Sequence, residues 1–456
     1  MNTFTSADRL HRLVKQALDS GAADSLEAAQ ALFQGYRLTL RIGADEARRA
    51  DHQAALLTAV TIGRRVFLGG VRVEGDLGAP LQLDRTFGST VADAVAALGG
   101  NVARPGEADA PVIIIGGPSL PRARGFHLRT AWWGWRGGVV PAHVDAPPNA
   151  VDAVPLACML SATLAVSEAF FHVRGGMSVA GRRALGLSLW NPGASDWESS
   201  DHDGPPLERL PSKLWLIGLG HLGQAYLWGL GLLPYSCDSL SLVLQDVDII
   251  TPSTESTSIL TDGDMVGKKK TRAMADWAER RGFATTLQER FFDARFERHE
   301  DEPGVALCGI DNALGRRALD KVGFDFVVEA GLGRGHRDFQ TMRLHTLPGS
   351  RTADELWKPP TTTEEDLTHQ PGYRKLLMEG ALDRCGVTLL AGKAVGAPFV
   401  GATAACLALS EVLRLLHGGP LSQLIDLDLL GLGHQFVTPQ THDFSAFNPG
   451  YTAITG

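Results

Sequence analysis

The stretch Lys213-Leu-Trp-Leu-Ile-Gly-Leu-Gly-His-Leu-Gly223 determines the fold expected for the second half of the chain. It joins an apolar run to the motif Gly218-x-Gly220-x-x-Gly223, and an apolar segment follows at residues 224–233. The first two glycines of such a motif allow a tight turn and a close approach to phosphate, and the third lets a helix pack on the preceding strand. Free N–H groups at the helix N-terminus then bind the anion. The stretch therefore predicts a nucleotide-binding βαβ unit.

Two acids follow the second strand of this unit. The strand is predicted at residues 240–244, and Asp246 and Asp248 come directly after it. An acid roughly 20 residues beyond the glycine motif, which is where Asp246 lies, can accept hydrogen bonds from ribose hydroxyls. Because NAD, FAD and other nucleotides share this fingerprint, the residues that follow it must distinguish between them.

The segments after the unit occur in an order that resembles the ThiF/MoeB and ubiquitin-activating enzyme superfamily, which adenylates protein C-termini. The usual pattern there is GxGGxG, D-x-D, S-N-x-x-R, D-x-G-K-x-K and D-N-x-x-x-R. The match covers roughly residues 212–345, with a weaker tail to about residue 435. Its later pieces are Ser253-Thr254, the run Asp264-Met-Val-Gly-Lys268-Lys-Lys270, the run Cys308-Gly-Ile-Asp311-Asn312-x-x-x-Arg316, and Val328-Glu-Ala-Gly-Leu-Gly333.

The resemblance implies ATP and Mg²⁺ as cofactors. It implies that Lys270 contacts the phosphates with help from Lys268, that Asp311 holds magnesium, and that Asp246 holds the ribose. The other reading of the lysines is a solvated helix start, and Asn312 could equally cap a helix. The nucleotide-binding set is then Gly218, Gly220, Gly223, Asp246, Asp248, Lys268, Lys270 and Asn312.

Two positions depart from the family pattern. Thr254 and Thr257 stand where relatives have an asparagine and an arginine, so a cation that neutralises phosphate is missing. Three explanations are open: another arginine replaces it, catalysis is slow, or the alignment slips locally. Arg48 and Arg49 are the candidates for replacement, since in relatives an arginine from the partner half's leading helix reaches the ATP. They precede a strand predicted at residues 64–70, although two exposed arginines would explain them as well. His221 replaces the usual glycine and is expected to face solvent.

Cysteine is the acceptor of the activated C-terminus in ubiquitin activators. Cys385 precedes the last apolar helix, as in simpler relatives, and Arg384 and Lys393 could favour its thiolate. The alternative is an unreactive loop cysteine. The chain has five cysteines and no C-x-x-C pair, so we expect no zinc. The remaining cysteines are expected to be core residues (Cys158, Cys308, Cys406) or without a supporting partner (Cys237).

Composition restricts the remaining classes of function. The 456 residues predict two or three domains, and 44% hydrophobic residues suffice for large cores. A net charge of −8 argues against a broad nucleic-acid footprint. The N-terminus is polar and no long apolar run is evident, so we expect neither a signal peptide nor a membrane span. Free thiols fit a cytoplasmic location.

An internal repeat predicts two related halves. Residues 161–169 (Ser-Ala-Thr-Leu-Ala-Val-Ser-Glu-Ala) resemble residues 404–412 (Ala-Ala-Cys-Leu-Ala-Leu-Ser-Glu-Val), although two similar core helices would look alike. We expect an α/β chain with two Rossmann-like, adenylation-type halves and mixed, largely parallel sheets. The boundaries are a helical cap at 1–40, a degenerate half at 41–190, a linker at 191–211, and an active half at 212–456 with a crossover loop at about 346–395.

The leading hypothesis is an activating enzyme for a ubiquitin-like protein. It would adenylate the C-terminus of that protein, take it as a thioester and pass it to a conjugating enzyme, as the stand-alone activators of bacterial ubiquitin-like conjugation operons do, some of them antiviral. The chain could also form a homodimer. Three alternatives remain: a sulfur-carrier or peptide adenylyltransferase without a thioester step, an NAD-linked oxidoreductase, and a non-catalytic scaffold.

Overall fold

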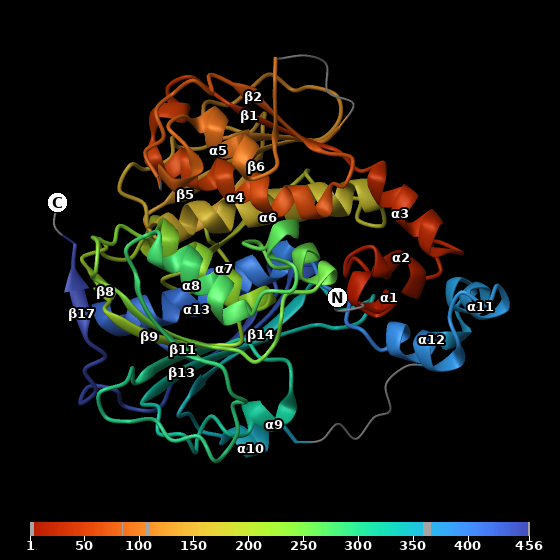
Figure 1. Ribbon diagram of the computed structural model, residues 1–456. Coiled ribbons are helices and arrows are strands. Elements are labelled where there is room, and N and C mark those ends of the chain that lie inside the picture. The colour runs from red at the N-terminus through yellow and green to blue at the C-terminus, as the bar shows by residue number, and fades with distance from the viewer. Residues whose placement is uncertain (1–3, 84, 105–109, 359–365, 455–456) are drawn as a thin grey trace.

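Two sheets, whose first seven strands follow the same order, form the two halves of the molecule. The computed structural model describes residues 4–83, 85–104, 110–358 and 366–454. The N-terminal sheet has the order β3-β2-β1-β4-β5-β6-β7, and the C-terminal sheet has the order β11-β10-β9-β12-β13-β14-β15-β16. In each sheet the first five strands pair in parallel and the later ones antiparallel. This arrangement confirms the predicted α/β fold with mixed, largely parallel sheets (Figure 1).

The N-terminal half corrects one predicted element. Residues 64–70, expected to be a strand, are the end of a long helix and the turn after it, because the apolar positions of 50–66 repeat at helical spacing. The strands are β1 (Leu38–Ile42), β2 (Val71–Gly75), β3 (Asn101–Ala103), β4 (Val112–Ile115), β5 (His127–Trp133), β6 (Arg136–Pro141) and β7 (Leu185–Ser188). The helices are η1 (Glu46–Arg48), α4 (Ala50–Val66), η2 (Arg85–Phe87), α5 (Val91–Ala97) and α6 (Pro155–Arg174).

The C-terminal half begins with the predicted βαβ unit. Its strands are β9 (Lys213–Ile217), β10 (Ser241–Gln245), β11 (Ala284–Gln288), β12 (Val305–Cys308), β13 (Phe326–Leu332), β14 (Thr341–Leu347), β15 (Ser422–Asp428) and β16 (Phe436–Pro439). Its helices are α7 (His221–Leu232), η4 (Pro252–Ser256), η5 (Gly263–Met265), α8 (Lys270–Glu279), α9 (Ala313–Arg316), α13 (Pro398–His417) and η7 (Leu429–Gly431).

The helices of the two halves meet between the sheets. Helix α4 connects β1 to β2 as α7 connects β9 to β10, and α6 precedes β7 as α13 precedes β15. These four helices pack together, and the hydroxyls of Thr163 on α6 and Thr403 on α13 lie 3.0 Å apart. The repeat at 161–169 and 404–412 therefore lies on two equivalent helices that face each other (Figure 1).

Helices α6 and α13 are also long and apolar enough to span a membrane. The apolar windows of Pro155–Arg174 and Pro398–His417 are 89% and 94% buried inside the fold. The expectation that no such run occurs was therefore wrong for these two segments. Their burial between two sheets accounts for their composition, since a helix that is hydrophobic on all sides belongs in a core.

Helix α4 holds the C-terminal half through polar contacts. The guanidinium of Arg65, 3% exposed, donates to the carbonyls of Glu255 at 2.9 Å and Thr261 at 2.7 Å. Thr61 Oγ1 donates to the carbonyl of Ile259 at 2.9 Å. These bonds satisfy backbone carbonyls at the buried interface, where an unpaired carbonyl would be costly.

The N-terminal cap packs against the crossover that precedes α13. The cap consists of α1 (Ser6–Arg9), α2 (Lys15–Asp19) and α3 (Leu26–Gln34). Tyr373 donates to Asp19 at 2.5 Å, and the same carboxylate pairs with the buried Lys15 at 2.5 Å. Residues 359–365 of the predicted crossover loop lie outside the described residues. The rest contains α10 (Ala353–Leu356), η6 (Leu367–His369), α11 (Pro371–Met378) and α12 (Arg384–Ala391).

The predicted linker at 191–211 follows the surface of the N-terminal half. It contains η3 (Ser200–His202) and β8 (Arg209–Pro211), which pairs with β17 (Tyr451–Ala453). Trp197 stacks on Trp133 with ring centroids 5.8 Å apart, and Asp203 accepts a hydrogen bond from Arg136 at 2.6 Å. Its ends therefore tie the strands of the first half to the last strand of the chain.

Candidate active site

The glycine loop lies at the carboxyl end of β9. Gly218 has a φ of +86°, and its N–H donates to the carbonyl of Gln245 at 2.8 Å. A Cβ on Gly223 would lie 2.0 Å from the carbonyl oxygen of Gly218, so only glycine fits there. Helix α7 starts at His221, directly after Gly220. The loop therefore presents the N-terminus of a helix to an anion, as predicted.

Asp246 braces this loop. Its Oδ2 accepts the N–H of Leu219 at 2.7 Å and its Oδ1 accepts the N–H of Asp248 at 2.8 Å. The side chain of Asp246 is 8% exposed, whereas that of Asp248 is 64% exposed. Of the two acids, Asp248 therefore has the more accessible carboxylate, and Asp246 holds the backbone of the loop.

Lys270 connects the acids to the glycine loop. It is the first residue of α8, and its Nζ lies 2.8 Å from Asp248 Oδ2 and 3.7 Å from Asp246 Oδ2. The Cβ position of Gly220 is 3.9 Å from the same Nζ. Burial lowers the pKa of Lys270, but Asp246, Asp248 and Asp311 outweigh it and raise the pKa above its usual value. The ammonium group is therefore charged and faces the loop.

Lys268 behaves differently from Lys270. Its side chain is exposed, with no hydrogen bond or ion pair to the described residues. Its backbone carbonyl accepts the N–H of Ile250 at 2.8 Å, which fixes the turn before α8. Of the two predicted lysines, the structure brings only Lys270 into contact with the acids.

Asp311 completes the acidic side of the site. It follows β12, is exposed, and accepts no hydrogen bond from any residue that the structure describes. The side chain of Asn312 accepts the N–H of Gly315 at 2.6 Å and so caps α9, which supports the capping interpretation. Behind them, Arg316 donates to the carbonyl of Ile310 at 2.8 Å and pairs with the buried Glu329 at 3.0 Å. This pair holds the segment that carries Asp311.

Arg12 is a site residue that sequence reasoning missed. Its N–H donates to Ser256 Oγ at 3.1 Å, and its carbonyl accepts the N–H of Gly396 at 3.4 Å. Burial lowers the pKa of Arg12, while Asp8 and Asp311 raise it, so its guanidinium lies within the field of Asp311. The segment between α1 and α2 therefore brings a second cation near Asp311. No local motif marks Arg12, because its partners are far away in the sequence.

Arg48 and Arg49 are engaged within the N-terminal half instead. Arg48 is 62% exposed and lies 3.6 Å from Asp76, and Arg49 pairs with Asp51 at 2.6 Å. Neither is among the charged groups that shift the pKa of Lys270. The prediction placed them before the first strand of their half, but β1 precedes both of them. They therefore occupy the loop after the first strand of their own sheet.

His221 is not turned to solvent as expected. A Cβ on Gly401 would lie 2.3 Å from its Nε2, so the ring packs against the first turns of α13. Burial lowers the pKa of His221 to about 4. Its Nε2 is buried without a hydrogen-bond partner in the described part of the chain. The neutral ring therefore joins the glycine loop to the helix that follows the crossover.

The five cysteines fall into two groups. Cys158, Cys308 and Cys406 are buried, and burial raises the pKa of each thiol. Cys237 is exposed, but a hydrogen bond to Asp238 raises its pKa. It precedes β10 and so lies at the amino ends of the strands, opposite the end that carries the glycine loop. Cys385 is exposed on the first turn of α12. It is the exposed thiol that lies in the crossover.

The arrangement suits a phosphate ligand and a hard cation. Within the described residues no group of three or more His, Cys, Asp or Glu side chains could hold a metal alone. Mg²⁺, however, binds through one or two carboxylates together with substrate phosphates and water. An exposed Asp311 beside two cations and a glycine loop fits that requirement.

Comparisons with solved structures find distant likenesses. The structure of E. coli MccB with MccA-N7isoASN is 12% identical, with a TM-score of 0.36, and the match covers 51% of this chain and 65% of that one. E. coli tRNA N6-threonylcarbamoyladenosine dehydratase, TcdA, is 18% identical, with a TM-score of 0.30 and coverage of 45% and 86%.

Comparisons with families are closer. The family model of the BilD N-terminal domain matches residues 37–189, and that of the BilD C-terminal domain matches residues 210–419. The bacterial E1-like protein BilD of Collimonas sp. (strain OK412) is 44% identical over 461 residues, which is 98% of both chains. The chain therefore belongs to the BilD family of bacterial E1-like proteins.

Proposed function

We propose that the C-terminal half binds ATP with magnesium and adenylates the C-terminal carboxylate of a ubiquitin-like protein. The observation that carries this proposal is the convergence of the glycine loop, Lys270, Asp311 and Arg12 at one end of the C-terminal sheet. Membership of an E1-like family supports it. An NAD-linked oxidoreductase would have no use for Lys270 and Asp311.

Each group has a distinct part in binding the nucleotide. The backbone of Gly218 to Gly223 and the ammonium of Lys270 hold the phosphates, and the exposed Asp248 accepts ribose hydroxyls while Asp246 keeps the loop in place. Asp311 holds magnesium, which when bound neutralises phosphate charge. Arg12 supplies the further positive charge that the motif itself lacks.

The reaction follows from this placement. A carboxylate oxygen of the ubiquitin-like protein forms a bond to the α-phosphorus, and the bond from that phosphorus to the leaving pyrophosphate breaks. Lys270 and Arg12 stabilise the charge that moves onto the pyrophosphate, and the loop fixes the phosphate in line. The chain itself needs no general base for this step, because the attacking group is already ionised.

The second step of the proposal uses Cys385. Its thiolate attacks the acyl carbon of the adenylate, a carbon–sulfur bond forms, AMP leaves, and the thiol proton passes to solvent. The exposure of Cys385 supports this role, as does the packing of α12 against α1, the helix just before Arg12. Among the other cysteines, three are buried and one lies at the opposite edge of the sheet.

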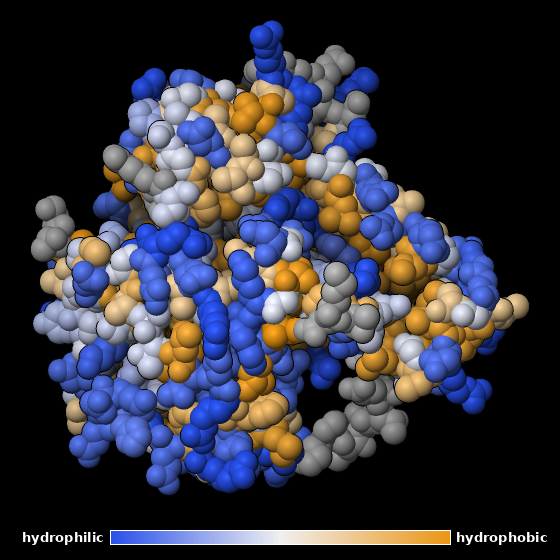
Figure 2. All heavy atoms as spheres, in the orientation of Figure 1, coloured by the Kyte–Doolittle hydropathy of each residue, from blue (hydrophilic) through white to orange (hydrophobic). Residues whose placement is uncertain are grey.

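The surface around Cys385 supports transfer to a protein partner. Exposed apolar side chains gather over α11 and α12, where Leu377 is 37%, Met378 87% and Leu389 50% exposed (Figure 2). A conjugating enzyme that takes over the thioester must contact this face, since Cys385 lies on it. Apolar side chains grouped in this way are typical of protein contact sites.

The test is pyrophosphate exchange into ATP that depends on the ubiquitin-like protein. Wild type should catalyse exchange and form a reducible covalent adduct with the ubiquitin-like protein. Cys385→Ala should keep exchange and lose the adduct, and the control Cys237→Ala should keep both. Exchange without any adduct in wild type would favour the adenylyltransferase alternative, and no exchange with any carrier would favour a scaffold.

A further inference from the structure

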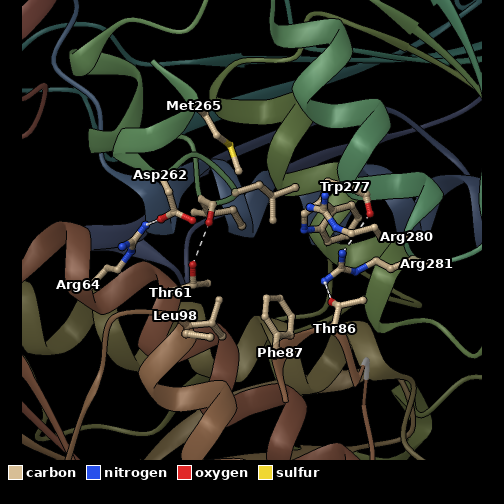
Figure 3. Close-up of a pocket in the computed structure, with 13 residues that line it drawn as sticks. Thr61, Arg64, Thr86, Phe87, Leu98, Asp262, Met265, Trp277, Arg280 and Arg281 are labelled. Atoms are coloured by element: carbon tan, nitrogen blue, oxygen red, sulfur yellow. Dashed lines mark hydrogen bonds and ion pairs between the residues drawn. The ribbon is translucent and has the colours of Figure 1, made fainter. Parts of the chain in front are cut away.

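A cavity lies between the two halves and shares no residue with the candidate active site. It has a volume of about 160 Å³. Its walls come from α4, η2 and α5 of the N-terminal half, and from residues 259–265 and α8 of the C-terminal half (Figure 3). A ligand in it would therefore touch both halves at once.

The walls of this interface cavity are largely apolar. Phe87 and Leu98 line one side in Figure 3, and Met265 and Trp277 line the other. A dry engineered cavity of about 150 Å³ is known to accept benzene, so a space of this size takes one ring or a short chain.

The polar groups of the cavity are mainly cationic. Arg64 lies opposite Arg280 and Arg281 in Figure 3, and Asp262 is the acid among the lining residues. Arg64 pairs with Asp262, but its Nε is buried and has no hydrogen-bond partner within the described residues. Arg280 likewise makes no side-chain hydrogen bond or ion pair to the part of the chain that the structure describes. Because Arg280 is exposed, its guanidinium is the cation at this cavity that a ligand can reach.

Arg281 shapes the wall and is already held. Its guanidinium lies 3.6 Å from the centroid of the Trp277 ring and 5.0 Å from that of Phe87. It also donates to Thr86 Oγ1 at 3.2 Å and to the carbonyl of Trp277 at 3.1 Å. These contacts hold it as a flat surface beside the cavity.

We propose that the interface cavity binds a small organic anion with an apolar body of about one ring and a carboxylate or phosphate head. The apolar walls receive the body, and the exposed guanidinium of Arg280 receives the head. Charge-assisted hydrogen bonds of this kind are stronger than neutral ones, which makes the site selective for an anion over a neutral analogue.

Such a ligand would act on the candidate active site through α8. This helix has 10 residues, with Lys270 at its start and Arg280 just after its end. At 1.5 Å per residue the two ends lie roughly 15 Å apart. A ligand that ties the end of α8 to α4 favours the state in which the halves are docked, and so fixes the helix that carries Lys270.

The experiment measures binding to the full chain by calorimetry and by thermal unfolding. The probes are benzoate and phenyl phosphate, with benzamide as the neutral control. Binding of either anion, with benzamide at least about 10-fold weaker, is the expected result. Comparing the two anions separates a carboxylate head from a phosphate head. Binding of neither anion, or equal binding of benzamide, would overturn the proposal.

Variants locate the binding. Arg280→Gln should weaken the anion about 10-fold or more, and Ala97→Phe, which fills the cavity from an exposed position of its wall, should abolish binding. Arg272→Gln on the same helix is the matched control, because Arg272 is 68% exposed and pairs with Glu289 away from the cavity. Unchanged binding in both Arg280→Gln and Ala97→Phe would show that the anion binds elsewhere.

Discussion

The two halves of the molecule share a strand order but differ at the carboxyl ends of their strands. Ile42 pairs with Gly75 and Ile115 in the first sheet, as Ile217 pairs with Gln245 and Cys308 in the second. The residues just beyond these pairs correspond by register, Gly43 with Gly218, Asp76 with Asp246, and Pro118 with Asp311.

The N-terminal counterpart of the glycine loop is closed to an anion. A Cβ on Gly43 would lie 2.1 Å from Oε2 of Glu46, so a carboxylate fills the loop. Asp76 pairs with Arg48, and α5 begins with Val91 where α8 begins with Lys270. The two halves thus keep the same buried helices between the sheets and differ in a few side chains at the carboxyl ends of the strands.

The largest expected difference between the halves is in catalysis. Lys270→Ala and Asp311→Ala should each lower pyrophosphate exchange about 100-fold or more, because they remove groups that neutralise phosphate charge. The matched changes in the first half, Val91→Ala and Pro118→Ala, should leave exchange within about twofold, as surface and core changes outside the site do. Equal losses of exchange from both sets would contradict the assignment of adenylation to the C-terminal half.

The contact between the halves should matter for stability. Arg65→Met removes a buried guanidinium and leaves the carbonyls of Glu255 and Thr261 unpaired, so the free energy of unfolding should fall by about 3 kcal/mol. The control Arg295→Met, at a side chain that is 89% exposed, should change it little. Urea unfolding monitored by tryptophan fluorescence measures both. If Arg65→Met were as stable as wild type, the hydrogen bonds of Arg65 would add nothing to the contact between the halves.

Acid should lower the free energy of unfolding through His221, which lies in the glycine loop. The folded pKa of His221 is lowered to about 4, below the unfolded value near 6.5, so its contribution is present above pH 6.5 and is lost as the pH falls toward 4. At pH 5 this loss is about 2 kcal/mol. His221→Asn should therefore lose less stability than wild type between pH 7 and pH 5 in urea unfolding. Parallel losses in the two proteins would contradict the burial of this ring.

The smallest expected effect separates the arginines of the two halves. Arg12→Ala should lower exchange about 10-fold, because it removes a second charge near Asp311 while Lys270 remains. Arg48→Ala and Arg49→Ala should leave the rate within about twofold, since both pair inside the first half. Initial rates at saturating ATP provide the measurement. If Arg48→Ala lowered the exchange rate as much as Arg12→Ala, Arg48 in the loop after β1 would be the arginine that neutralises phosphate charge.

Features that depend on the local sequence could be predicted, whereas features that depend on contacts between distant residues could not. The glycine motif, the strand–acid order and the capping Asn312 are local features, so the second half and its loop were predictable. The position of Arg12 is fixed by a hydrogen bond to Ser256, which is 244 residues away in the sequence. The pattern of apolar residues gives no sign of such a contact. The strand expected at 64–70 was wrong because a short apolar run fits a helix end equally well, and this error misplaced Arg48 and Arg49.

The stoichiometry of nucleotide binding tests the difference between the halves most directly. Calorimetric titration of the full chain with ATP and magnesium should give one site per chain, with no comparable binding of NAD. Lys270→Ala should weaken that site strongly, and Arg48→Ala should leave it unchanged. Two ATP sites per chain, or tight binding of NAD without binding of ATP, would contradict the account.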